Sequence, residues 1–177
     1  MSFNINYNFL NECDRDHLLN KLHSSTWWGK FEDKEAFTFT YKKRELPCEL
    51  KAFETDKHNL YQFVAIKTTK GGAIGEHIDD DFSTDFISKN PGAIIGLPET
   101  TVYYVDIDNN MEGGSLIIEN KKIQPETNMA VILSPGCSHS VTNIEKANKP
   151  RIAIVCEKYF VLRKYLPLIK TPNFRKG

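Results

Sequence analysis

The sequence predicts a mainly β (α+β) fold, an antiparallel sandwich or barrel of short strands with an N-terminal helix packed outside it. Short apolar or alternating segments recur along the chain and are separated by turns rich in Gly, Pro and Asn. Only the region before residue 25 has the apolar spacing of a clear helix. The length of 177 residues and hydrophobic content of 40% fit a single domain, residues 1–177, with a sizeable core.

The helix is expected from about Glu12 to Ser24. Asn11 and Asp14 resemble a capping box, in which an Asn N-cap is followed three residues later by a carboxylate. The apolar residues that follow recur at roughly helical spacing: Cys13, Leu18, Leu19 and Leu22.

The expected strands are segments rich in β-branched and aromatic residues, and 60–68 (LYQFVAIKT) is the strongest. The others lie at 36–41, 49–54, 101–107, 115–118, 130–133, 138–144 and 151–156. One more turn of helix is expected near 162–168. The stretch 80–98 has no core periodicity, so we expect a long loop there.

Composition excludes several classes of protein. Lys+Arg and Asp+Glu both total 23, so no overall charge attracts nucleic acid or an anionic membrane. The N-terminus lacks the features of a signal peptide, and no apolar run approaches the roughly 20 residues that span a bilayer. No two cysteines form a CxxC pair, so we expect reduced thiols in a cytoplasmic protein. The four cysteines are Cys13, Cys48, Cys137 and Cys156.

Three side chains form the pattern of a metal site. His77 and Asp79 are two residues apart, so on an extended segment both point to one face. His139 lies 62 residues after His77 and just after a Pro-Gly turn. This interval accommodates several strands of a double-stranded β-helix. Two imidazoles and one carboxylate on one octahedral face leave three positions open, as in non-haem Fe(II) sites.

Each part alone has a simpler interpretation. An HxD sequence is common without a metal, and a single histidine such as His139 more often forms a structural hydrogen bond. The other histidines have no partner at a useful spacing and are interpreted as surface or structural: His17, His23 and His58. Only the combination indicates a metal.

A basic residue is placed to bind an acidic co-substrate. Arg151 opens the strand 151–156, and antiparallel pairing would place it beside His139. A guanidinium can bind a carboxylate through two parallel hydrogen bonds. Small apolar residues on the same strand faces would form the walls of the pocket: Val141, Ala153 and Val155.

These segments together resemble the Fe(II)/2-oxoglutarate-dependent dioxygenases, most closely the prolyl-hydroxylase-like group. The resemblance rests on the HxD sequence, on VYYVD and EGGSLII, on the Pro-Gly turn before the distal histidine, and on HSVTNI followed by RIAIV. It covers about residues 60–160, the expected catalytic core, and implies a jelly-roll, cupin-like double-stranded β-helix.

The resemblance also implies roles for particular residues. The Fe(II) ligands would be His77, Asp79 and His139. Arg151 would bind the 5-carboxylate of 2-oxoglutarate, while Tyr104 would contact the co-substrate and Val141 would border it. Two features depart from the pattern: Lys67 stands where many relatives have a tyrosine, and Lys149 falls at a position that some relatives use for the carboxylate. Arg151 and Lys149 therefore both stay open.

The implied activity is that of a hydroxylase, which uses O2 and 2-oxoglutarate to oxidise an unactivated C–H bond and releases succinate and CO2. Asp79 argues against halogenation, because halogenating relatives lack this carboxylate. The primary substrate stays open between peptidyl proline, another protein side chain and a small metabolite. The alternative class is a non-catalytic cupin-like module that binds metal or a small acid. A nucleic-acid demethylase gains no support from the neutral composition.

The stretch Asp80–Pro98 directly follows two of the expected ligands. We expect it to be a lid that orders over bound substrate and keeps water from the reacting centre. Its acidic residues would favour a cationic substrate: Asp80, Asp81 and Asp85. The alternative is a solvated loop with no role.

Overall fold

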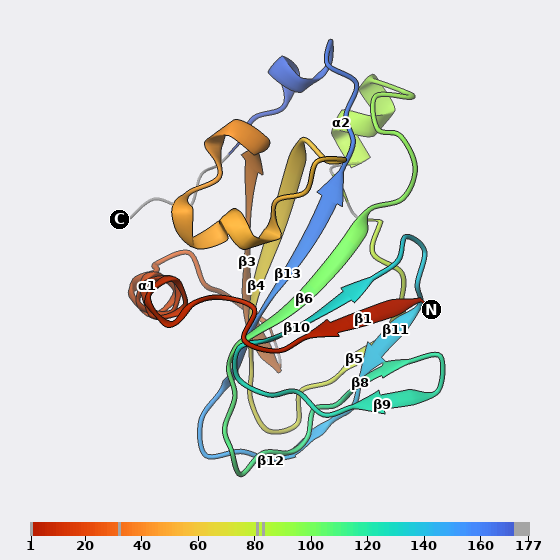
Figure 1. Cartoon of the computed structure of the whole chain (residues 1–177). Coiled ribbons are helices and arrows are strands. Elements are labelled where there is room, and N and C mark those ends of the chain that lie inside the picture. The colour runs from red at the N-terminus through yellow and green to blue at the C-terminus, as the bar shows by residue number, and fades with distance from the viewer. Residues whose placement is uncertain (1, 32, 81, 83, 172–177) are drawn as a thin grey trace.

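The computed structural model describes residues 2–31, 33–80, 82 and 84–171. Two antiparallel sheets dominate the fold (Figure 1). The larger sheet has the order β1-β10-β6-β13-β4-β3-β2, the smaller sheet β5-β11-β8-β9, and β12 pairs with β7 alone. The mainly β fold with a helix packed outside it is thereby confirmed.

The bounds of the elements are as follows. The larger sheet contains β1 (Phe3–Asn6), β2 (Gly29–Lys30), β3 (Lys34–Lys42), β4 (Leu60–Thr68), β6 (Glu99–Asp106), β10 (Met129–Leu133) and β13 (Arg151–Tyr159). The smaller sheet contains β5 (Ile74–His77), β8 (Leu116–Ile118), β9 (Lys121–Ile123) and β11 (His139–Val141); β7 is Glu112–Gly113 and β12 is Ile144–Lys146. The helices are α1 (Glu12–Ser24), α2 (Thr84–Lys89) and the 3-10 helices η1 (Lys43–Glu45), η2 (Cys48–Phe53) and η3 (Leu166–Leu168).

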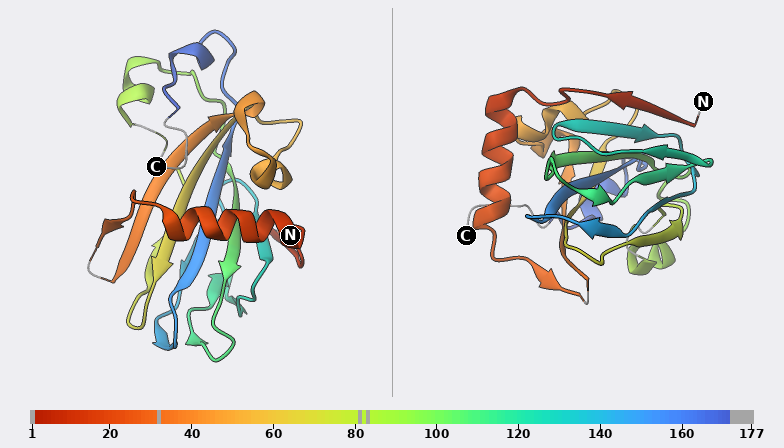
Figure 2. Two further views of the ribbon diagram at one scale, coloured as in Figure 1. Left: turned by 90° about the vertical axis from the view of Figure 1, so that its left-hand side faces the viewer. Right: turned by 90° about the horizontal axis from the view of Figure 1, so that it is seen from below.

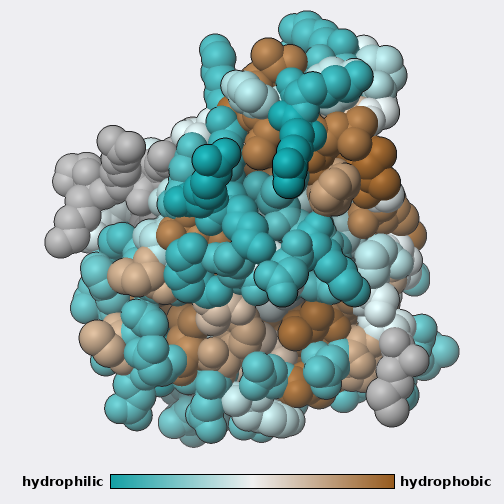
Figure 3. All heavy atoms as spheres, turned by 45° about the horizontal axis from the view of Figure 1, so that its top comes forward, coloured by the Kyte–Doolittle hydropathy of each residue, from teal (hydrophilic) through white to brown (hydrophobic). Residues whose placement is uncertain are grey.

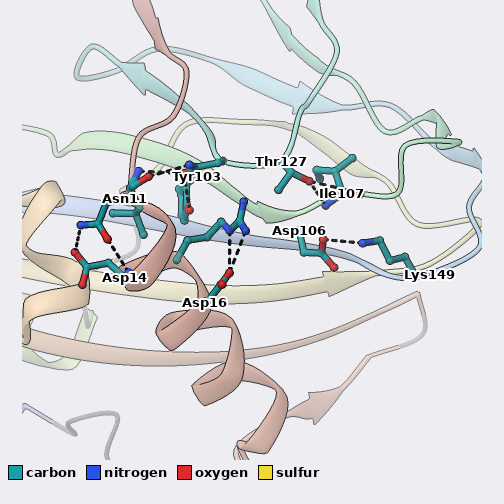
Figure 4. A network of polar contacts seen from close by, with 11 residues as sticks. Asn11, Asp14, Asp16, Tyr103, Asp106, Ile107, Thr127 and Lys149 are labelled. Atoms are coloured by element: carbon teal, nitrogen blue, oxygen red, sulfur yellow. Dashed lines mark hydrogen bonds and ion pairs between the residues drawn. The ribbon is translucent and has the colours of Figure 1, made fainter.

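Helix α1 lies across the outer face of the larger sheet (Figure 2). The side chain of Asn11 accepts a hydrogen bond from the Asp14 backbone N–H at 2.9 Å, which caps the helix as expected (Figure 4). Leu18 and Leu22 are fully buried against the sheet, whereas Cys13 is exposed. The helix therefore closes one core of the protein.

The inner face of the larger sheet packs against the smaller sheet. Side chains alternate along β13, so Ile152 and Ile154 join the core under α1 while Ala153 faces inward. The inner core also includes Val102 from β6 and Leu116 from β8. The space between the two sheets is where the expected site residues meet.

The expected strand at Glu49–Glu54 is wrong, because the chain forms the 3-10 helix η2 there. Pro47 precedes its first turn, and Leu50 and Phe53, three residues apart, are both buried on one side. Glu49 is also buried and forms an ion pair with Lys21 of α1. A strand would point alternate residues to opposite faces and would separate Leu50 from Phe53.

Three other boundaries differ from expectation. The segment 138–144 is not one strand, since β11 pairs with β5 and β8 whereas β12 pairs with β7. The tail near 162–168 forms only the short helix η3, which contains Pro167. The stretch 80–98 is not wholly irregular, because it contains α2.

Helix α2 and the segment after β13 lie together at one end of the molecule (Figures 1 and 2). Phe82, just before α2, is 4% exposed and its ring lies 5.1 Å from the ring of Tyr159. Leu60, Val161 and Ile169 complete this third cluster. Seen toward this end, hydrophobic side chains appear between hydrophilic ones (Figure 3). Among the described residues, no helix is long and apolar enough to cross a membrane.

Candidate metal centre and acid-binding pocket

A cavity of about 250 Å³ lies between the two sheets. The smaller sheet contributes His77 and His139 to its lining, and the larger sheet contributes Tyr104 and Arg151. Asp79 lies in the chain just after β5 and also lines the cavity. Residues far apart in the sequence are thus brought to one cavity.

Among the described residues, one group of His, Cys, Asp or Glu side chains could hold a metal ion. It consists of His77, Asp79 and His139. Their ligand atoms all lie within 4.8 Å of one another. His77 and His139 are opposite each other in the pairing of β5 with β11. The Asp79 carboxylate lies between them, with Oδ1 3.4 Å from His77 Nε2 and Oδ2 3.6 Å from His139 Nε2.

Hydrogen bonds orient both imidazoles for metal binding. Nδ1 of His77 lies 2.9 Å from the Gly75 carbonyl oxygen, and Nδ1 of His139 lies 3.2 Å from that of Cys137. A carbonyl oxygen only accepts, so each Nδ1 carries the proton and each neutral Nε2 presents a lone pair. This is the arrangement by which neighbouring groups orient metal-ligating histidines.

The electrostatic environment matches the same donor set. Burial alone would raise the pKa of Asp79, but its contacts with His77 and His139 and a hydrogen bond from Thr100 together lower it. Burial lowers the pKa of His139, against the attraction of Asp79. Asp79 Oδ2 is buried with no hydrogen-bond partner among the described residues. A carboxylate beside two neutral imidazoles suits a divalent metal ion.

Arg151 lies at the cavity wall, and part of its guanidinium has no hydrogen-bond partner among the described residues. It is 2% exposed, and its guanidinium donates to the Gly114 carbonyl oxygen at 3.1 Å and to Thr68 Oγ1 at 3.4 Å. Its Nε and the nearby Tyr104 hydroxyl are buried without a hydrogen-bond partner among the described residues. Burial raises the pKa of Tyr104 to about 12, so the hydroxyl remains a donor. Both groups are therefore available to an acidic ligand.

The structure corrects the expected position of Arg151. Strand β13 pairs with β4 and β6, whereas β11 pairs with β5 and β8. Arg151 is therefore not a neighbour of His139 in one sheet but lies across the cavity from it. Val141, Ala153 and Val155 line the same cavity and form apolar walls.

Lys149 and Lys67 do not line this cavity. Lys149 is half exposed, and its Nζ donates to Asp106 Oδ1 at 2.7 Å (Figure 4). The Nζ of Lys67 lies 3.9 Å from the centre of the Trp28 ring. Of the two basic residues left open by the sequence, only Arg151 reaches the cavity.

Sequence reasoning missed three polar residues that shape the site. Thr68 supports Arg151 from the neighbouring strand, and Glu157 lines the cavity. Gln62 donates to Glu157 at 3.2 Å. The signal for Glu157 was present, because residues 151, 153, 155 and 157 share one face of a strand. Thr68 and Gln62 depend on the register between strands, which a single sequence does not show.

Comparison with known proteins finds likeness at the level of structure. No family model matches the sequence, and no curated protein matches it. A viral collagen prolyl hydroxylase from Paramecium bursaria Chlorella virus-1, solved with 2-oxoglutarate, aligns with a TM-score of 0.63 at 14% identity, over 91% of this chain and 97% of its own.

Two further solved structures are similar. A Pseudomonas putida prolyl-4-hydroxylase gives a TM-score of 0.62 at 10% identity, over 90% of this chain and 92% of its own. A Trichoplax adhaerens prolyl hydroxylase, in complex with a peptide fragment of hypoxia inducible factor, gives 0.54 at 20% identity, over 96% and 87%.

The fold is that of the 2-oxoglutarate/Fe(II) oxygenases. The resemblance seen in the sequence is thereby confirmed at the level of fold, with prolyl hydroxylases among the structural neighbours. The match extends over nine-tenths of the chain, which is more than the segment 60–160 that carried the resemblance in the sequence.

Proposed function

We propose that this protein is an Fe(II)/2-oxoglutarate-dependent hydroxylase. His77, Asp79 and His139 hold the metal, and Arg151 with Tyr104 holds the 5-carboxylate of 2-oxoglutarate. The primary substrate is a protein side chain of the prolyl type or a small metabolite. When bound, the metal and co-substrate would supply the oxidising chemistry, in which the substrate R–H, O2 and 2-oxoglutarate give R–OH, succinate and CO2.

The observation that carries this proposal is the buried guanidinium of Arg151 in the same cavity as the proposed metal ligands. A buried charge is costly unless it is paired, yet no carboxylate of the described residues forms an ion pair with Arg151. The buried Tyr104 hydroxyl near it also lacks a hydrogen-bond partner within the described part of the chain. An anionic ligand that accepts from both groups would satisfy them.

The protein's own residues position the reactants. Arg151 and Tyr104 fix one end of the diacid, while the apolar side chains of Val141 and Ala153 exclude water along its length. The Nδ1–H groups of His77 and His139 stay bound to backbone carbonyls, which keeps both rings oriented. The viral collagen prolyl hydroxylase of similar fold was solved as a complex with 2-oxoglutarate, which supports the same co-substrate here.

A succinate-release assay tests the proposal. Purified protein with Fe(II), ascorbate and 2-oxoglutarate should form succinate, and candidate peptides or amino acids should stimulate it. His139→Ala should be inactive. His23→Ala is the matched control that should keep full activity, because His23 lies on α1 away from the cavity. A protein that binds metal and 2-oxoglutarate but never forms succinate would instead be a non-catalytic cupin-like module.

A further inference from the structure

Lys34 is a second basic residue that lines the cavity together with Arg151. Thr68 lies between the two, because it pairs with Lys34 across β3 and β4 and with Arg151 across β4 and β13. Residues directly opposite one another in paired strands point to the same face of the sheet. Two strand spacings of about 4.8 Å place the two backbone positions roughly 10 Å apart. The two cations are therefore in one cavity but far enough apart to hold separate ligands.

The Lys34 ammonium forms no ion pair or hydrogen bond with another described residue. The acidic residues on either side of it in the sequence have other partners. Asp33 Oδ2 accepts a hydrogen bond from the backbone N–H of Ala73 at 3.4 Å. Glu35 Oε2 lies 3.5 Å from Nζ of Lys67 on the neighbouring strand. Lys34 thus brings an unpaired positive charge to the cavity.

Neither carboxylate that lines the cavity is paired with Lys34. Asp79 lies between the two histidine ligands, 3.4 Å and 3.6 Å from their Nε2 atoms. Glu157 lies in a different row of the sheet, since it pairs with Gln62 and Gln62 pairs with Thr40, six residues after Lys34. At about 3.3 Å per residue, that row is roughly 20 Å away along the strand. The cation at this edge of the cavity is left for a ligand.

The cavity floor beside Lys34 is apolar and partly open. Ala36 follows Lys34 by two residues on β3, so it faces the same side, and it is directly opposite Ile66 on β4. Both line the cavity and are only partly buried. Val102 and Ala153, which line it farther along the larger sheet, are 4% and 3% exposed. A substrate entering from the open side would therefore contact Lys34 and this apolar floor.

The acidic residues that were expected to favour a cationic substrate do not support that preference. Asp80 and Asp85 are exposed, and neither lines the cavity, while Asp81 lies outside the described residues. Asp85 Oδ1 forms an ion pair with Nζ of Lys89 in the same short helix at 2.8 Å. On the open side of the cavity, the charged group that the described residues provide is basic.

Building on the proposed function, in which Arg151 holds the co-substrate, we propose that Lys34 binds a carboxylate of the primary substrate. The substrate class is a small aliphatic carboxylic acid, free amino acids with apolar side chains included. Its carbon chain would lie on Ala36 and Ile66, between Lys34 and the metal ligands. An ammonium gives a carboxylate a charge-assisted hydrogen bond. An internal prolyl residue of a peptide has no carboxylate, so Lys34 would favour the small acid over it.

Direct binding of two matched probes tests this. The probes are pentanoate and pentanamide, which share a carbon chain and differ in charge. Binding to the full chain is measured by NMR titration with 2-oxoglutarate and Zn(II) present, because Zn(II) is diamagnetic and does not support turnover. Wild-type protein should bind pentanoate about tenfold or more tightly than pentanamide. Lys34→Gln should lose most of that preference, and Lys34→Arg should keep it.

Lys30→Gln is the matched control, because Lys30 is exposed on β2 and does not line the cavity. This variant should keep the preference for pentanoate. An equal loss in Lys30→Gln would show a general effect of surface charge and overturn the assignment of Lys34. Equal binding of both probes by wild-type protein, saturable binding of neither, or an unchanged preference in Lys34→Gln would overturn it as well.

The role of Lys34 is also separable from that of Arg151. Lys34→Gln should bind 2-oxoglutarate with wild-type affinity in calorimetric titration, and a loss as large as that of Arg151→Ala would assign Lys34 to the co-substrate instead. Failure of the proposed function is seen independently, as absence of 2-oxoglutarate binding or of succinate release. Even then, the comparison of wild type with Lys34→Gln decides whether this lysine binds the carboxylate probe.

Discussion

At the scale of single residues, Arg151 and Lys149 differ in their surroundings rather than in their charge. Arg151 is buried in the cavity, while Lys149 is exposed and paired with Asp106. Arg151→Ala should weaken 2-oxoglutarate binding by about ten- to a hundred-fold, since a charge-assisted contact contributes roughly 1.5–3 kcal/mol. Lys149→Ala should change it little. Calorimetric titration with 2-oxoglutarate measures both, and a larger effect in Lys149→Ala would contradict the assignment.

The metal ligands make a second prediction at this scale. His139→Ala removes one of three donors, and the remaining pair, His77 and Asp79, has only one imidazole. Binding of Mn(II), measured by the loss of its free-ion EPR signal, should fall by at least about tenfold. His58→Ala is the control, because His58 bonds to Thr55 outside the cavity. Unchanged Mn(II) affinity in His139→Ala would remove that residue from the site.

At the scale of elements, Gly113 fixes the junction of β7 and β12. Its φ is +77°, and a Cβ atom there would lie 2.0 Å from the backbone oxygen of Asn143. Gly113→Ala should therefore destabilise the protein by about 1–3 kcal/mol in urea unfolding. A Cβ atom at Gly75 would have open space around it. Gly75→Ala should therefore change the free energy of unfolding by no more than about 0.5 kcal/mol, as is usual for surface substitutions. Equal stability of both variants would show that the junction can move.

At the scale of the whole molecule, the proposed ligands join the two sheets. The smaller sheet carries both histidines and the larger sheet carries Arg151, so a metal and 2-oxoglutarate bound as proposed would bridge the two sheets. Mn(II) and 2-oxoglutarate together should raise Tm more than Mn(II) alone, by mass action on the folded state. Arg151→Ala should lose only the 2-oxoglutarate part of the rise, and EDTA should remove all of it. Differential scanning fluorimetry measures these changes in Tm. If 2-oxoglutarate raises the Tm of Arg151→Ala as much as that of the wild type, Arg151 does not link the ligand to the larger sheet.

The sequence by itself determined the helix α1, most strands and the spacing of His77, Asp79 and His139. These follow from local periodicity, capping and the two-residue repeat of a strand, all of which act between near neighbours. Local pattern did not separate the 3-10 helix η2 from a strand, because short apolar segments fit both periods until packing against α1 selects one.

Only the tertiary structure decided which basic residue reaches the cavity and what faces it. Arg151 and Lys149 are two residues apart in sequence, yet one begins a central strand and the other lies before it. The pairing of β13 with β4 and β6 placed Arg151 across from His139 and brought Gln62 and Thr100 to Glu157. Strand register depends on contacts between distant segments, so no single stretch of sequence encodes it.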